Sequence, residues 1–166
     1  LGDVYKRQGY SLVRRVFAAS GWDYQRQVAD LGRTVGEELL EPTRVYAADM
    51  VDLAAHLGAG LHALTHVTGG GLAANLARVL PRGLLGTVHR ASWTPAPIFD
   101  LVQRLGRVPA ADLERTLNMG VGMAAVVAQE SADQALTRLA ERGVPAWVLG
   151  EVHDPGPSPQ GPTVQG

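Results

Sequence analysis

Two periodicities of hydrophobic positions divide the chain into alternating helical and extended segments. In the segments expected to be helices, apolar residues recur three or four positions apart, which places them on one helix face. These segments are residues 10–19, 23–31, 43–57, 72–80, 94–106, 110–116 and 131–143. Shorter apolar segments that fit strands are residues 61–67, 86–91, 119–128 and 144–149. Strands that alternate with helices favour a layered α/β arrangement with the sheet in the middle, whether parallel or mixed.

Several helix boundaries carry recognisable signals. Thr43 follows a proline and is expected to be an N-cap, with Tyr46 on the apolar face of the helix that follows. Pro95 is expected at the start of a later helix, where its fixed φ angle is favourable. Ser131 and Gln134 have the spacing of a capping box, which predicts that the last helix begins there.

The two ends of the chain differ from the rest. Residues 1–8 run into the first helical pattern without a cap or turn, and we expect them to be a leader foreign to the domain. Residues 154–166 hold four Pro and three Gly with little apolar content, which predicts disorder. The expected domain therefore covers residues 9–153.

Composition narrows the class of protein. Hydrophobic residues make up 46% of the chain and charged residues 19%, which is typical of globular proteins. No apolar run approaches the roughly 20 residues of a membrane span, and no signal peptide is recognisable, so we expect a cytoplasmic protein without a membrane partner. The net charge of −1 lacks the positive footprint of a nucleic-acid-binding protein.

The residue inventory also limits the chemistry. The absence of cysteine excludes disulfides, thiolate nucleophiles and cysteine-based zinc sites. His62 and His66 are the only histidines with a spacing near that of ligands, and an isolated strand pair of this kind does not predict a metal site. Because Lys6 is the only lysine, a bound phosphate must be held by arginine, by backbone N–H groups or by a metal.

The sharpest signal for a binding site is the turn between a predicted strand and a predicted helix. Gly69, Gly70 and Gly71 permit positive φ angles and leave backbone N–H groups for an anion at a helix start. Thr68 adds a hydroxyl donor, and His66 at the strand end is within reach of a ligand. The alternative is a plain turn whose glycines serve tight packing, and the residues alone leave both interpretations open.

A second candidate is Asn118, which precedes a glycine-containing strand start. Gly120 and Gly122 predict a bulge or a close approach of another group to the backbone. The segment is not a dinucleotide-binding fingerprint, because no third glycine follows and a strand comes next. Packing explains these glycines unless Asn118 faces a cleft. No residue pattern identifies a catalytic group.

Six segments, taken in order, resemble the C-terminal domain of the aminoimidazole ribonucleotide synthetase (phosphoribosylformylglycinamidine cyclo-ligase) family. They are GYSLVRRVF (9–17), GEELLEPTRVY (36–46), THVTGGGLAANLARVLP (65–81), SWTPAPIFDLVQRLG (92–106), ERTLNMGVGMAAVV (114–127) and AWVLGEV (146–152). Val67 and Leu117 stand where the family usually has Ile and Phe, and both are mild changes.

The resemblance implies an α+β fold of three layers, α/β/α, with helices on both sides of a mixed sheet. It implies a ligase of purine biosynthesis that uses ATP and Mg²⁺ to close formylglycinamidine ribonucleotide to aminoimidazole ribonucleotide. The family's N-terminal half, which holds most of the ATP and Mg²⁺ site, has no counterpart in this sequence, so we expect the fragment alone to be inactive. The full-length enzyme is expected to be a homodimer. The alternative is a non-catalytic binding or assembly module that retains only the scaffold.

Overall fold

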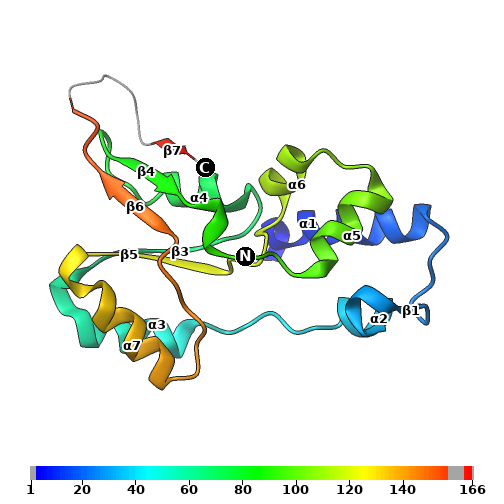
Figure 1. Ribbon diagram of the computed structural model, residues 1–166, viewed down its shortest axis with the longest axis horizontal. Coiled ribbons are helices and arrows are strands. Elements are labelled where there is room, and N and C mark those ends of the chain that lie inside the picture. Colours follow the sequence, from blue (N-terminus) through cyan, green and yellow to red (C-terminus); the bar gives the residue numbers. More distant parts are fainter. Residues whose placement is uncertain (1–2, 157–162, 166) are drawn as a thin grey trace. The chain divides into compact units, whose positions relative to one another are not determined.

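The computed structural model describes residues 3–156 and 163–165, which form helices interspersed with short strands (Figure 1). The helices are α1 (Asp3–Ala19), α2 (Val35–Leu39), α3 (Ala47–Leu57), α4 (Gly71–Ala77), α5 (Pro97–Gly106), α6 (Ala110–Thr116) and α7 (Ala132–Glu141). The strands are β1 (Gln27–Val28), β2 (Arg33–Thr34), β3 (Leu61–His66), β4 (Leu85–Val88), β5 (Met123–Val127), β6 (Gly150–His153) and β7 (Thr163–Gln165). This mixture of helices with small sheets confirms the α+β class.

The described residues form two compact units, each built from separate stretches of chain. Unit 1 comprises the chain up to Thr43, Thr68–Leu72 and Pro95–Val121. Unit 2 comprises Arg44–Val67, Ala73–Thr94 and the chain from Gly122 onward. Each unit has a hydrophobic core of its own. None of the helices in the described residues has the length and apolar character needed to cross a membrane.

The core of unit 1 forms where α1 packs against α5. Val13, Val16 and Phe17 recur at helical spacing and are buried, and they meet the buried residues Leu101 and Val102 of α5. The apolar spacing predicted helices at 10–19 and 94–106, and these buried residues lie within those two segments. α1 begins at Asp3 and continues through residue 8, so the expected boundary after the leader does not coincide with a helix end.

α5 begins two residues later than the sequence analysis predicts. Pro97, rather than Pro95, occupies the first turn, and Ala96 before it is extended, with φ −60° and ψ 150°. A residue that precedes proline is sterically disfavoured in the helical region, so Ala96 cannot continue a helix from Pro95.

The predicted helix at 23–31 is wrong. The chain forms a small antiparallel pair instead, in which Gln27 of β1 pairs with Thr34 of β2. Gly32 lies between these strands with a φ of 67°, a left-handed conformation that ends the short 3₁₀ turn before it. The Asp23 side chain also accepts a hydrogen bond from the Gln25 N–H at 3.0 Å, a local interaction that competes with helix formation.

Unit 2 is organised by the antiparallel pairing of β3 with β5. The register runs from Leu61 opposite Val127 to His66 opposite Met123, with an irregularity after Leu61. The strand predicted at 61–67 is therefore confirmed. The one predicted at 119–128 is shorter, because it begins only at Met123.

Helices cover both faces of this strand pair, as the layered interpretation predicts. On one face lie α3 and α7 (Figure 1), and there Leu64 packs against the core that includes Leu53 and Leu139. On the other face, the buried Thr65 hydroxyl donates a hydrogen bond to the Asn75 carbonyl of α4 at 3.1 Å. Consecutive strand residues point to opposite faces, so these two contacts show a helix–strand–helix layering within unit 2.

A network of ion pairs joins the outer surfaces of α3 and α7. Arg138 binds both carboxylate oxygens of Asp52, each at 2.7 Å, and Arg142 contacts Asp49 at 2.9 Å. The hydrogen bonds from Arg138 hold the pKa of Asp52 below its ordinary value, and the positive charges of Arg138 and Arg142 act in the same direction. The bidentate geometry fixes the relative rotation of the two helices, although water screens these partly exposed charges.

A second sheet in unit 2 contains both strand orientations. β4 pairs with β6 in the antiparallel sense and with β7 in the parallel sense, so the predicted mixed sheet is confirmed. β7 lies within the tail that was predicted to be disordered, and its three residues instead extend this sheet. Residues 157–162 and 166 of that tail lie outside the described residues.

The strand predicted at 144–149 is wrong. Pairing with β4 begins only at Gly150. Before it, the Leu149 carbonyl accepts a hydrogen bond from the His89 N–H at 2.9 Å, and the Val144 N–H donates to the Leu139 carbonyl of α7 at 2.9 Å. Trp147 in this segment packs against Trp93, with ring centroids 6.5 Å apart. The apolar pattern therefore reflects contacts of side chains rather than membership of a sheet.

Two of the predicted helix caps are wrong. α3 begins at Ala47, well after Thr43, and no side chain caps it. Ser131 occupies the N-cap position of α7 but has helical angles and makes no capping bond, because a 3₁₀ turn leads directly into the helix. Gln134, the expected partner of Ser131, contacts His56 at 3.1 Å instead.

The capping box of this chain lies at the start of α2. The Glu37 N–H donates to the Thr34 hydroxyl at 3.2 Å, and the Thr34 N–H donates to the Glu37 carboxylate at 2.8 Å. The Thr34 hydroxyl also donates to the Glu37 carboxylate at 2.9 Å, and the hydrogen bonds from the Thr34 N–H and hydroxyl lower the pKa of Glu37. The Thr-x-x-Glu spacing is visible in the sequence and could have been recognised there.

We expect Thr34→Ala to lower the free energy of unfolding by about 1 kcal/mol, because it removes the hydroxyl that satisfies a helix N–H. Thr43→Ala is the matched control and should change stability by less than about 0.5 kcal/mol, since Thr43 is exposed and caps no helix. Urea denaturation followed by circular dichroism measures both. Equal effects of the two substitutions would contradict the capping role of Thr34.

Candidate functional site

The pairing of β3 with β5 brings together the two glycine-containing segments that the sequence analysis singles out. β3 ends where β5 begins, with His66 opposite Met123. Beyond this pair, the Val67 N–H donates a hydrogen bond to the Gly122 carbonyl at 2.9 Å. The turn that begins at Thr68 and the turn that ends at Val121 therefore leave from the same end of the strand pair.

The glycine turn after β3 has the conformation that its sequence predicts. φ is 99° at Gly70 and 73° at Gly71, values that only glycine adopts readily. The Gly71 N–H donates to the Thr68 carbonyl at 3.1 Å, which closes the turn, and α4 begins at Gly71.

Gly71 also has a packing role. A Cβ atom added to Gly71 would lie 1.8 Å from the carbonyl oxygen of Glu114 in α6, so no larger residue fits without moving backbone. The tight-packing interpretation therefore holds for this one glycine. Anion binding by Thr68, Gly69 and Gly70 stays a prediction.

The segment before β5 forms a tight turn around Asn118. The Val121 N–H donates to the Asn118 carbonyl at 3.0 Å, and φ is positive at both central residues, 51° at Met119 and 93° at Gly120. These angles belong to a type I′ turn, which is unfavourable for methionine. The Asn118 side chain accepts a hydrogen bond from the Gly120 N–H at 3.0 Å, so its carbonyl oxygen supports the turn. Its role toward a ligand stays a prediction.

Gly122 shows the close approach to the backbone that the sequence predicts. A Cβ atom at Gly122 would lie 2.1 Å from the hydroxyl oxygen of Tyr46. The Tyr46 ring in turn packs edge-on against the His66 ring, with centroids 6.0 Å apart and planes at 64°. Sequence reasoning missed Tyr46 as a site residue, because its helical spacing indicates only a packing position and its contact with Gly122 is not local.

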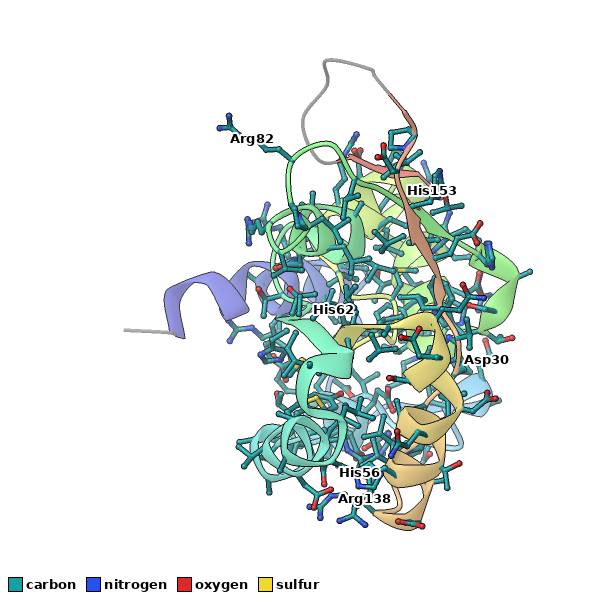
Figure 2. All side chains as sticks on the ribbon, turned by 90° about the vertical axis from the view of Figure 1, so that its left-hand side faces the viewer. Asp30, His56, His62, Arg82, Arg138 and His153 are labelled. Carbon is teal, nitrogen blue, oxygen red and sulfur yellow. The ribbon has the colours of Figure 1, made fainter. Side chains whose placement is uncertain are left out.

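The described residues do not gather the ligands of a metal centre at this site. Among the described residues, no group of three or more His, Asp or Glu side chains gathers in a way that could hold a metal ion. His62 is exposed on β3 (Figure 2). A hollow of about 270 Å³ in unit 1 is lined by residues of α1 and α5 such as Leu12 and Leu105, and none of the predicted site residues lines it.

Comparison with known proteins supplies independent information. Residues 7–158 match the family described as AIR synthase related protein, C-terminal domain. A protein of Streptomyces fradiae, provisionally named phosphoribosylformylglycinamidine cyclo-ligase, is 58% identical over 151 residues, which are 90% of this chain and 82% of that protein. The phosphoribosylformylglycinamidine cyclo-ligase of Sorangium cellulosum is 47% identical over 152 residues, 91% of this chain and 44% of that enzyme. The one from Pseudothermotoga lettingae is 40% identical over 144 residues, 87% of this chain and 42% of that enzyme. The chain thus spans less than half the length of these last two relatives.

We expect Gly71→Ala to lower the free energy of unfolding by about 1–3 kcal/mol more than Gly83→Ala does. Both glycines have positive φ angles, 73° and 90°, so both substitutions carry the cost of placing a side chain on a residue with positive φ. An added Cβ meets the Glu114 carbonyl at Gly71 but nothing within 4 Å at Gly83. Urea denaturation of the two variants measures the difference. Equal losses would show that the glycine at 71 is required for conformation alone.

Proposed function

The chain belongs to the family of AIR synthase related proteins and corresponds to their C-terminal domain. We propose from this that it is the C-terminal part of a phosphoribosylformylglycinamidine cyclo-ligase. The enzyme would close formylglycinamidine ribonucleotide to aminoimidazole ribonucleotide in purine biosynthesis. The observation that carries the proposal is the family match over residues 7–158. The names of the relatives support the reaction class.

We propose ATP and Mg²⁺ as the further requirements of the complete enzyme, bound mainly by the part of the longer relatives that this chain does not match. ATP would phosphorylate the formyl oxygen of the substrate and leave as ADP, and an internal nitrogen would then attack the formyl carbon and release that oxygen as inorganic phosphate. Such a reaction depends on positioning and on charge stabilisation rather than on a protein nucleophile. The contribution of this domain is then to hold the substrate. A homodimer of the complete enzyme and a cytoplasmic location are also expectations from the sequence.

We propose that the turn of Thr68, Gly69 and Gly70 binds the ribose phosphate of the substrate, and that His66 and Asn118 are further binding residues. Three observations support this placement. The turn has positive φ at Gly70, where the backbone is free of a side chain. The turns that contain Thr68 and Asn118 leave from the same end of the strand pair. The chain has a single lysine, at position 6, which leaves arginine, backbone N–H groups or a metal to hold an anion. Gly71 contributes through packing and turn closure, because its N–H is bonded to the Thr68 carbonyl.

A domain exchange tests the reaction class. Residues 9–153 of this chain replace the matching segment of the Sorangium cellulosum enzyme, and ATP-dependent formation of aminoimidazole ribonucleotide is assayed. We expect the hybrid to be active and the 166-residue chain alone to be inactive, because the remaining part of the site is supplied only in the hybrid. The unmodified enzyme is the positive control. A folded but inactive hybrid would instead favour a binding or assembly module that retains only the scaffold.

The phosphate turn is tested in the same hybrid. Gly70→Val is expected to raise the KM for formylglycinamidine ribonucleotide at least about tenfold with little change in the KM for ATP, because a side chain blocks the approach to backbone donors. Gly83→Val is the matched control, since its φ of 90° is similar to the 99° of Gly70 and its surroundings are open. Melting curves establish that each variant is folded. If the folded Gly70→Val variant has an unchanged KM for the substrate, the proposal that phosphate binds at this turn is contradicted.

A further inference from the structure

Tyr46 is held at the end of the β3–β5 pair by contacts on two sides. It is the residue before α3, it is half-buried, and its ring packs against the His66 ring at a centroid distance of 6.0 Å. Its hydroxyl oxygen lies over Gly122, whose carbonyl accepts the hydrogen bond from Val67. The phenol oxygen is therefore fixed at the point where β3 ends and β5 begins.

Gly122 leaves the space that the Tyr46 hydroxyl occupies. φ is positive at several glycines of the chain, but Gly122 is not among them, so its backbone conformation does not require glycine. What a side chain would disturb is the space of the Tyr46 hydroxyl, 2.1 Å from the position of an added Cβ. The hydroxyl oxygen of Tyr46 is the atom nearest to this position, and the ring carbons Cζ and Cε2 follow at 2.9 and 3.1 Å.

The Tyr46 hydroxyl has no hydrogen-bond partner within the part of the chain that the structure describes. Tyr10 is different, because its hydroxyl donates to the Leu39 carbonyl. Among the described residues, the one buried side-chain oxygen that lacks a partner belongs to Ser92, so the Tyr46 oxygen keeps access to solvent. A tyrosine hydroxyl that is enclosed on two sides and still open to solvent can donate a hydrogen bond to a ligand.

We propose that Tyr46 is a ligand-binding residue whose hydroxyl donates a hydrogen bond to an oxygen of a phosphorylated ribose at the end of the β3–β5 pair. His66 supports the ring from one side, and Gly122 provides the space for the oxygen. This inference rests on the proposed function, since it adds a residue to the substrate site of the cyclo-ligase. The inference is independent of the glycine turn, because Tyr46, His66 and Gly122 make their contacts with one another.

The test is titration of the 166-residue chain with ribose 5-phosphate, followed by calorimetry and by the chemical shifts of the His66 ring. Tyr46→Phe removes only the oxygen and keeps the ring against His66. We expect it to weaken binding about tenfold, the effect of losing one hydrogen bond to a charged or polar ligand group. Its melting temperature should stay unchanged. Tyr24→Phe is the matched control and should bind as the wild type does, because Tyr24 lies in unit 1 and is 56% exposed.

Each outcome decides the inference. Equal affinities of the wild type and Tyr46→Phe would overturn it, and so would a wild-type chain that does not bind ribose 5-phosphate. A loss of affinity in Tyr24→Phe as large as that in Tyr46→Phe would also overturn it.

The hybrid enzyme separates this inference from the proposed function. If the hybrid is active and Tyr46→Phe has no effect, only the proposed Tyr46 contact is contradicted. If binding depends on Tyr46 but the hybrid is inactive, the proposed reaction is contradicted and the ligand site stands.

Discussion

The register of β3 against β5 is the constraint on which the candidate site depends. Because side chains alternate between the two faces of a strand, a shift by one residue would exchange the faces of the whole strand. In the observed register, Leu64 packs against α3 and α7, and Thr65 faces α4. His66 falls on the same face as Leu64, which brings its ring to Tyr46. The position of the site thus follows from the burial of apolar residues elsewhere on the strand.

The glycines around this site are required for different physical reasons, although they look alike in the sequence. Gly70 and Gly120 have positive φ angles that turn the chain. Gly71 has such an angle as well, but it also lacks room for a Cβ because the Glu114 carbonyl is adjacent. Gly122 needs neither a turn nor a left-handed conformation, and it makes space for a side chain from another element. A glycine-rich motif therefore combines turn geometry, helix packing and access to the site.

Local patterns in the sequence predicted those elements whose cause is local. The apolar stripe of α5 and the strand that ends at His66 were found, since period and length are visible along the chain. The helix predicted at 23–31 failed because a short pairing of nearby residues and the Asp23–Gln25 hydrogen bond decided the conformation, neither of which the apolar period shows. The strand predicted at 144–149 failed because pairing with β4 begins only at Gly150, while Trp147 contacts the distant Trp93. The resemblance identified the family, and the glycine turn was recognised as a candidate. Tyr46 could not be recognised, because its importance comes from a contact between elements far apart in the sequence.

The two compact units are interleaved along the chain, which passes from one to the other at residues 43, 67, 72, 94 and 121. Neither core is therefore encoded by a continuous stretch of sequence. A single recombination breakpoint between residues 43 and 122 would divide at least one of the cores between two proteins. We therefore expect the two units to be inherited together despite their separate hydrophobic cores, and variation among relatives to concentrate in substitutions and loop lengths rather than in the loss of either unit.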